Sequence, residues 1–282
     1  MKKGIIVKEI SSSQNDQFKY WKTLLRSKGL REAKHFLLSG KKLVQEVLND
    51  ETWAHKVEGI LIEKDNSAAS IASTDVGSHI SFNNQNQNQN INSHLKIELS
   101  SKIIHLSSVL FKELDVLGTN GPILVLEQPK ILPWDSAVAA RGLEILCPLG
   151  DPQNLGAVIR TSYAFGVNSV VLLKEAAHPF LPKSIKASSG AVLKIPLQQG
   201  PSIDRLKGKS IIALDLNGAE LNSKKWPVHS MRLLLGEEGK GVPESFEGER
   251  MTLPMVNPME SLNAAVAAGI VIYQLSERAK NK

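Results

Sequence analysis

An alternation of apolar runs and amphipathic segments, which begins at Gly142, constrains the fold of this chain most. Residues 154–165 carry apolar side chains at helical spacing, and a final helix is expected over residues 261–279. Apolar strands that alternate with helices are typical of a mostly parallel sheet covered on both faces. The sequence therefore predicts an α/β domain over residues 142–282, with strands at residues 143–149, 169–173, 211–214 and 231–235, and with Leu155, Val158, Ile159 and Phe165 on one side of the first helix.

The pattern of helices and strands expected over residues 1–130 indicates a second, smaller α/β domain. Helices are expected over residues 16–50, with breaks at Gly29 and Gly40, and over residues 106–117. Strands are expected at residues 57–62 and 123–126, and Phe18, Trp21, Leu24 and Leu25 lie at helical spacing.

Two further stretches are expected to lie outside the domain cores. Residues 131–141 contain Pro133 and Trp134 and favour a linker between the domains. Residues 83–92 are almost entirely Asn and Gln, with Ile91 as the one apolar residue. Because such a tract cannot bury a core, a mobile surface insertion is expected there.

Positive charge is concentrated near the N-terminus. The chain has a net charge of +6, whereas residues 1–42 hold eleven Lys and Arg against three Asp and Glu, a surplus of +8. A polyanion such as RNA fits this surplus, and an ordinary solvated helix face is the alternative that charge alone leaves open. Cys147 is the one cysteine, and no apolar run reaches the roughly 18 residues of a membrane helix. A cytoplasmic protein with no membrane partner is expected.

Residues 151–160, Asp-Pro-Gln-Asn-Leu-Gly-Ala-Val-Ile-Arg, follow a predicted strand and open a predicted helix. Ligands of open α/β sheets lie beyond the carboxyl ends of strands, so Asn154 is a candidate site residue. Arg160 is nearly two helical turns further on, where a guanidinium can hold a phosphate or a developing oxyanion. A helix cap at Asn154 and a plain surface arginine at 160 are the alternatives.

Residues 235–244 follow another strand and contain Gly236, Gly239 and Gly241, which favour a tight loop where backbone approaches a ligand. The loop lacks the Ser or Thr that follows Gly-Lys in a phosphate-binding loop, and Glu237 and Glu238 would repel phosphate. S-adenosylmethionine, which has a sulfonium, an ammonium and no phosphate, fits better. A plain glycine-rich turn is the alternative.

In residues 253–270 a strand end leads through two prolines to a helix rich in Ala and Gly. Backbone amides at the start of this helix could hold a carboxylate or hydroxyls, and its small residues permit close packing. The alternative is a buried helix capped by Ser261. The seven histidines are scattered without metal-ligand spacing, so no metal is expected.

Taken in order, the three segments closely resemble the motifs of the TrmH/SpoU family of SPOUT methyltransferases. The likeness covers residues 142–282, while residues 15–42 and 57–62 resemble, more loosely, the family's RNA-binding domain, a small α/β unit like certain ribosomal proteins. Residues 186–191 resemble another family segment, near the substrate side. The matching residues are Asn154-Leu155-Gly156 with Arg160, Gly236-Glu237-Glu238-Gly239-Lys240-Gly241, and Leu253-Pro254-Met255 with Ser261-Leu262-Asn263.

The resemblance implies a C-terminal domain tied in a deep trefoil knot, which binds S-adenosylmethionine and forms a homodimer. It implies methyl transfer to a ribose 2′-hydroxyl of structured RNA, with ribosomal RNA preferred to transfer RNA. A base methyltransferase and an inactive RNA-binding protein of the same fold are the rivals. Ser261-Leu262-Asn263 favours ribose over base, and intact Arg160, Glu238 and Asn263 favour an active enzyme.

The resemblance also assigns roles to residues. Arg160 is expected to clamp the phosphate and the developing alkoxide, with Asn154, Glu238, Ser261 and Asn263 as the other catalytic positions. The expected cofactor-binding residues are Leu214, Gly236, Leu253, Met255, Ser261 and Leu262. Glu237 stands where the family usually has Asn, and Ala264 stands where Val is common, which leaves the details of the cofactor loop open.

Overall fold

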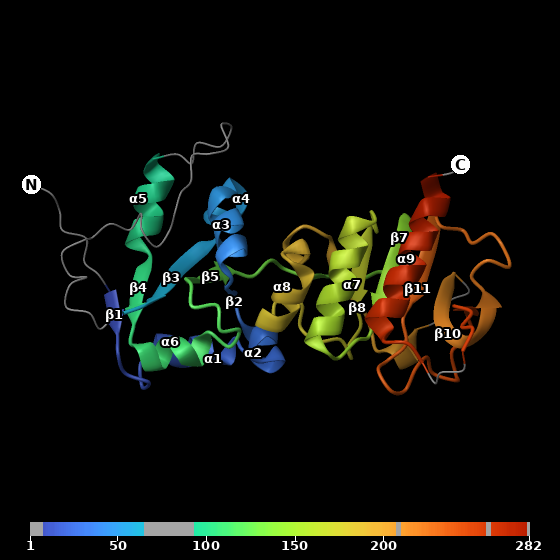
Figure 1. Ribbon diagram of the computed structural model, residues 1–282, viewed down its shortest axis with the longest axis horizontal. Coiled ribbons are helices and arrows are strands. Elements are labelled where there is room, and N and C mark those ends of the chain that lie inside the picture. The colour runs from blue at the N-terminus through green and yellow to red at the C-terminus, as the bar shows by residue number, and fades with distance from the viewer. Residues whose placement is uncertain (1–7, 65–92, 207–209, 258–260, 281–282) are drawn as a thin grey trace, which may run out of the picture. The chain divides into compact units, whose positions relative to one another are not determined.

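The computed structural model describes residues 8–64, 93–206, 210–257 and 261–280 (Figure 1). The Asn- and Gln-rich tract at 83–92 lies outside the described residues. The chain divides into two compact units, one of Met1–Pro129 with Phe180–Pro182 and one of Lys130–Pro179 with Lys183–Lys282.

The N-terminal unit is built on a five-stranded mixed sheet in the order β1-β4-β3-β5-β2. Strands β1, β4 and β3 are parallel, and β5 runs antiparallel to both β3 and β2. The strands are β1 (Lys8–Ile10), β2 (His35–Leu38), β3 (Val57–Glu63), β4 (Ile103–Leu106) and β5 (Ile123–Glu127). The helices are α1 (Asp16–Thr23), α2 (Ser27–Glu32), α3 (Lys41–Asn49), α4 (Glu51–Ala54), α5 (Ser93–Ser101) and α6 (Ser108–Leu114).

The predicted strands at 57–62 and 123–126 are confirmed as β3 and β5. The prediction of helices throughout residues 16–50 is wrong at His35–Leu38, which form β2 and pair with β5. This pairing joins residues about 90 positions apart, and such tertiary contacts override local helical spacing. The break expected at Gly29 is also wrong, because Gly29 lies inside α2. Helix α6 is shorter than expected, since Leu106 ends β4.

Helix α1 anchors the core of the N-terminal unit. The side chain of Asn15 caps it by accepting hydrogen bonds from the backbone amides of Gln17 and Phe18. Phe18, Trp21 and Leu24 are buried as their spacing predicts, and Leu25 is half-buried. The apolar face of α1 therefore packs inward and leaves its basic residues exposed.

The C-terminal unit contains a seven-stranded sheet in the order β12-β10-β11-β7-β8-β9-β6, and every neighbouring pair is parallel. This confirms the predicted mostly parallel α/β domain. The strands are β6 (Leu132–Pro133), β7 (Gly142–Cys147), β8 (Ser169–Leu172), β9 (Leu197–Gln199), β10 (Ile211–Glu220), β11 (Ser230–Leu234) and β12 (Glu249–Thr252). The helices are α7 (Pro152–Ala164), α8 (Pro182–Ser188) and α9 (Ala264–Lys280).

Both faces of this sheet are buried. Leu146, Ala213 and Leu234 belong to a core cluster that includes Ile203 and Phe246 from the connecting segments. Side chains alternate along a strand, so their neighbours point to the opposite face, where Ile145, Val170, Ile212 and Leu233 are also buried. Helix α7 packs against β8 and lies beside α9 (Figure 1).

The stretch expected to be a linker, residues 131–141, is partly fixed to this sheet. Strand β6 pairs with β9, and Trp134 packs against the core cluster. Arg232 is buried on β11, where it forms an ion pair of 3.0 Å with Glu144 and donates hydrogen bonds to the backbone oxygens of Ser136 and Val138. Part of the predicted linker therefore pairs with this sheet or is hydrogen-bonded to it. Within the described ranges, no helix is both long and apolar enough to cross a membrane.

Candidate functional site

Four neighbouring strands bring the three sequence motifs to one edge of the parallel sheet. Strands β12, β10, β11 and β7 are adjacent and parallel, so the segments that follow them leave the sheet on the same side. Asp151 follows β7, Gly236 follows β11, and Leu253 and Met255 follow β12. Ligands of open α/β sheets bind at this edge.

Leu214 departs from its expected position at a strand end. It lies inside β10, opposite Met251 of β12, at the point where the strand register shifts. The extra residues of this bulge let β10 continue to Glu220. Leu214, Leu253 and Met255 are all half-buried, so each keeps some apolar surface accessible at the sheet edge.

Helix α7 begins with Asp151, whose side chain accepts hydrogen bonds of 2.9 Å from the backbone amides of Gln153 and Asn154. Asp151 is therefore the cap, and the alternative of a cap at Asn154 is wrong. An Asp followed by Pro152 at the first helical position is a recognisable start signal, which the sequence argument did not use. The side chain of Asn154 is consequently available for other partners.

The glycine-rich loop is a tight hairpin. Glu237 and Gly241 exchange two backbone hydrogen bonds of 2.9 Å, and the φ angles of Gly239 and Gly241 are 81° and 73°. A Cβ atom on Gly236 would lie 2.8 Å from the carbonyl carbon of Gly241, so there is no room for a side chain there. The hairpin presents Glu237, which pairs with Lys240 at 3.4 Å, and the exposed Glu238.

Glu238 links this hairpin to the start of α7. One carboxylate oxygen accepts a hydrogen bond of 2.9 Å from the backbone amide of Asp151. The other accepts a hydrogen bond of 2.5 Å from the side-chain Nδ2 of Asn154. Hydrogen bonds to an ionised carboxylate are stronger than neutral ones, so the second and first motifs are held firmly together.

Asn263 links the third motif to the same group. Its Oδ1 atom caps α9 by accepting from the backbone amides of Ala265 and Val266, at 2.9 and 3.1 Å. Its Nδ2 atom donates to Oδ1 of Asn154 at 3.1 Å. The alternative that Ser261 caps the helix is therefore wrong. Glu238, Asn154 and Asn263 form one hydrogen-bonded chain, which we call the polar triad.

Small residues bring the helices of this site close together. A Cβ atom on Gly156 would lie 2.5 Å from the backbone oxygen of Ser184 on α8, so only glycine fits at this position of α7. On α9, Gly269 faces Thr161 of α7, with 3.8 Å between the position of an added Cβ and the Thr161 methyl carbon. The glycine of the first motif thus serves helix packing.

The remaining predicted residues lie around the polar triad without joining it. Arg160 is exposed on α7, and its side chain has no hydrogen bond or ion pair with any residue that the structure describes. Ser261 is exposed and Leu262 is half-buried, and both directly precede Asn263. The structure brings together Asn154, Glu238 and Asn263, while the contact of Arg160 with this group stays a prediction.

Cys147 is the last residue of β7, and its side chain is fully buried. Burial raises the pKa of its thiol to about 12, and the charge of Glu238 acts in the same direction. The thiol therefore stays protonated at neutral pH and is a poor nucleophile. Across the described ranges, no group of three or more His, Cys, Asp or Glu residues is placed to hold a metal ion.

Residues 145–273 match the model of the SpoU rRNA Methylase family. The chain is 34% identical over 274 residues to the Ribosomal RNA small subunit methyltransferase G 2 of Syntrophobacter fumaroxidans. The alignment covers 95% of this chain and 49% of that protein. It is 28% identical over 279 residues to the 23S rRNA (guanosine(2553)-2′-O)-methyltransferase RlmP of Bacillus subtilis, with 95% and 99% of the two chains covered.

The fold is similar to the crystal structure of an AdoMet-bound rRNA methyltransferase from Sinorhizobium meliloti. The TM-score is 0.70 and the identity 21%, with 96% of this chain and 98% of that chain covered. The chain spans about half the length of the Syntrophobacter relative and nearly all of the Bacillus one. The match confirms the resemblance to the TrmH/SpoU family for residues 145–273, whose three motifs meet in the polar triad.

Proposed function

We propose that the C-terminal unit transfers a methyl group from S-adenosylmethionine to a ribose 2′-hydroxyl of structured RNA, with ribosomal RNA as the substrate. The observation that carries this proposal is the polar triad, which joins Asn154, Glu238 and Asn263 from three distant motifs. The Bacillus relative, which acts on a ribose of 23S rRNA by its name, supports the choice of substrate.

The residues at the sheet edge fit S-adenosylmethionine. Leu214, Leu253 and Met255 offer apolar surface for an adenosine ring, and the hairpin with its two glutamates suits a ligand that carries positive charge. Gly236 carries no side chain that could obstruct a ligand, so its backbone groups suit close approach. We propose that these residues, together with Ser261 and Leu262, hold the cofactor. When bound, the cofactor supplies an electrophilic methyl group on its sulfonium.

We propose Arg160 as the electrostatic clamp of the reaction. A guanidinium remains protonated at neutral pH, which makes it a poor general base. Its fork of donors can instead bind the phosphate beside the target ribose and stabilise negative charge on the 2′-oxygen as the proton leaves. Arg160 is exposed and has no ion-pair partner among the described residues, so its charge is available to RNA.

The polar triad and Ser261 are proposed to orient the reacting groups. In-line methyl transfer requires the attacking oxygen about 3–3.5 Å from the methyl carbon, so positioning supplies much of the rate. Glu238 and Asn263 hold Asn154 from both ends, which fixes the starts of α7 and α9 relative to each other. The exposed hydroxyl of Ser261 lies two residues before Asn263, where it can contact a bound ligand.

We also infer a homodimer formed through α7 and α9. Val266, Ile270 and Tyr273 lie at positions i, i+4 and i+7 of α9 and are 53%, 39% and 49% exposed. Phe165, predicted to lie on the same side of its helix as Leu155, Val158 and Ile159, is 37% exposed whereas those three are buried, and its ring centroid lies 5.2 Å from that of Tyr273. A continuous exposed apolar strip on two helices is typical of a protein interface.

The domain assignment follows from the same proposal. We infer that residues 142–282 form the methyltransferase domain and residues 1–130 the RNA-binding domain, joined by residues 131–141. The trefoil knot implied by the family stays a prediction. A cytoplasmic location is inferred from the proposed ribosomal RNA substrate.

Transfer of radiolabelled methyl groups tests the function directly. The full chain is titrated with S-adenosylmethionine by calorimetry and then incubated with ribosomal or transfer RNA from a strain that lacks the gene. We expect cofactor binding, and label in ribosomal RNA that survives alkaline hydrolysis in dinucleotides. Label on a base, label only in transfer RNA, or cofactor binding without transfer would each contradict the proposal.

A further inference from the structure

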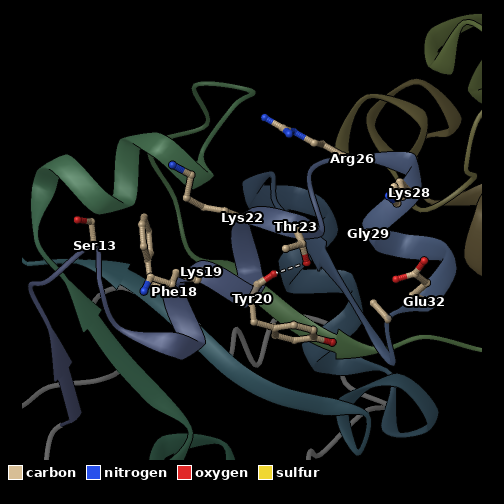
Figure 2. A pocket seen from close by; sticks show the side chains of 11 residues that line it. Ser13, Phe18, Lys19, Tyr20, Lys22, Thr23, Arg26, Lys28, Gly29 and Glu32 are labelled. Atoms are coloured by element: carbon tan, nitrogen blue, oxygen red, sulfur yellow. Dashed lines mark hydrogen bonds between the residues drawn. The ribbon is translucent and has the colours of Figure 1, made fainter.

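The N-terminal unit carries a hollow of 740 Å³ on α1 and α2 (Figure 2). Four of its lining residues are cations, Lys19, Lys22, Arg26 and Lys28, and one is an anion, Glu32. The difference of four and one gives the lining a formal charge of +3. This local surplus lies on one surface, whereas an ordinary solvated helix face carries both signs of charge interspersed.

Three of these cations are not neutralised by the protein. Lys22 forms an ion pair of 2.5 Å with Glu113. Lys19, Arg26 and Lys28 are exposed, and none of their side chains has a hydrogen bond or ion pair with another residue in the described part of the chain. Figure 2 shows the side chain of Arg26 extending freely from the ribbon. The three free charges are therefore available to a partner.

The floor of the hollow is rigid. Phe18 is fully buried, and the hydroxyl of Tyr20 is hydrogen-bonded to Nδ1 of His35 at 2.8 Å, with the two rings edge to face. Burial raises the pKa of Tyr20, so its phenol remains neutral. Thr23 donates from its hydroxyl to the backbone oxygen of Tyr20 at 2.7 Å. Helix α1, which carries Lys19, is thus held in place before any partner binds, which lowers the entropic cost of binding.

We propose that this hollow binds the sugar-phosphate backbone of the RNA substrate through Lys19, Arg26 and Lys28. Cations on exposed, ordered helices suit an extended polyanion, because each can contact a separate phosphate. Such contacts position an RNA without reading its bases. The choice of RNA over other polyanions rests on the proposed function. The site is a docking surface, and the methyl transfer itself belongs to the C-terminal unit.

Two matched double variants of the full chain test this proposal. Lys19→Gln/Lys28→Gln removes two charges from the hollow, and Lys41→Gln/Lys42→Gln removes two exposed charges at the start of α3, outside it. For the hollow variant, we expect the slope of log affinity for ribosomal RNA against log salt to fall by about 1.4–1.8, and affinity at 0.1 M salt to fall at least about tenfold. The α3 variant should keep the wild-type slope. Equal losses in both variants would overturn the proposal.

Acetylation footprinting of the unmodified protein gives an answer that does not depend on the folding of a variant. With ribosomal RNA bound, Lys19 and Lys28 should react more slowly with an acetylating reagent, while Lys41 and Lys42 should react as in the free protein. Polyglutamate with the same total charge as the RNA is added as a competitor. It should displace bound RNA from the hollow only poorly. Unprotected Lys19 and Lys28, or polyglutamate that competes as well as RNA, would contradict the assignment.

The outcome for the docking site can be separated from the outcome for the enzyme. In methyl transfer assays, the hollow variant should raise the KM for RNA and leave kcat and cofactor affinity unchanged. Protection of Lys19 and Lys28 in a protein that transfers no methyl group would refute the proposed function and retain the docking site. If the hollow variant transfers methyl groups with the wild-type KM for RNA, the docking site would be refuted and the proposed function retained.

Discussion

The side-chain amide of Asn263 donates a hydrogen bond of 3.1 Å to the side-chain oxygen of Asn154, which lies 109 residues earlier in the chain. Asn154 in turn donates to Glu238, so each asparagine amide has a defined orientation. A carboxylate only accepts hydrogen bonds, which requires the Nδ2 atom of Asn154 to face Glu238 and leaves its Oδ1 atom for Asn263.

Asn154 is the central residue of the polar triad, so its substitution should break both hydrogen bonds of the triad. Asn154→Ala removes both side-chain bonds, and because Glu238 and Asn263 are exposed to water, we expect a loss of only about 0.5–1.5 kcal/mol in unfolding free energy, together with reduced turnover. Urea unfolding and kcat measure the two effects. Gln153→Ala, at the neighbouring exposed position, is the control and should behave as wild type. An unaffected Asn154→Ala enzyme would remove the polar triad from the mechanism.

Loss of Arg160 should affect turnover and leave stability unchanged. The side chain is exposed and unpaired among the described residues, so Arg160→Ala should unfold like wild type. If the guanidinium stabilises charge on the attacking oxygen, kcat should fall by about 10²–10³-fold while the Kd of S-adenosylmethionine changes less than about twofold. Arg160→Lys keeps the charge without the fork of donors and should recover part of the rate. Wild-type turnover in the alanine variant would exclude the clamp.

A side chain at Gly236 should distort the glycine-rich hairpin, which we propose to hold the cofactor. The added Cβ of Gly236→Ala would lie 2.8 Å from the carbonyl carbon of Gly241, so backbone must shift at a cost of about 1–3 kcal/mol. We expect a clearly weaker affinity for S-adenosylmethionine in calorimetry. Gly121→Ala, where the nearest heavy atom lies at 3.8 Å, is the control for a tolerated glycine substitution. Equal behaviour of the two variants would argue against the role of the hairpin.

A charge on the exposed strip of α9 should prevent dimer formation. Ile270→Glu places a carboxylate among Val266, Tyr273 and their counterparts, and sedimentation analysis should give the monomer mass where wild type gives the dimer mass. Val109→Glu, at an apolar residue that is 71% exposed in the N-terminal unit, should remain dimeric. A monomeric wild-type protein, or a dimeric Ile270→Glu variant, would refute the inferred interface.

The buried ion pair between Arg232 and Glu144 should be sensitive to the loss of one partner. Arg232→Met leaves the Glu144 carboxylate buried without its counter-charge, which costs roughly 3–5 kcal/mol of stability. The double variant Arg232→Met/Glu144→Leu should recover part of that loss, because no unpaired charge remains while the backbone oxygens of Ser136 and Val138 still lack their donor. Thermal unfolding of the single and the double variant tests this reason. If Arg232→Met caused only a packing defect, the double variant would be no more stable than the single one.

The sequence predicted β7, β8, β10 and β11 and the meeting of the three motifs, because these depend on strong, ordered patterns. The three motifs placed Asn154, Glu238 and Asn263 at one location, where the hydrogen bonds join them. The capping residues were harder to predict. Asp151 and Asn154 are both good caps, as are Ser261 and Asn263, and only the contacts across the site decide between them.

The failures have a common physical origin in contacts between distant residues. Strand β2, His35–Leu38, forms because β5 offers a pairing partner about 90 residues later, and nothing in the local spacing indicates it. Phe165 fits the apolar face of α7 by spacing, yet it lies at the end of that helix and is exposed beside Tyr273. Local patterns predict most helices and strands. Contacts with distant residues decide where an element ends and where the local pattern fails.

The bond between Asn154 and Asn263 also sets an order of events during synthesis. Strands β7 and β11 and helix α7 all precede α9 in the chain, so they leave the ribosome before Asn263 does. The sheet can be built while its reactive edge still lacks one of its three polar residues. A nascent chain that has not yet docked α9 therefore has most of the parallel sheet but lacks the completed polar triad.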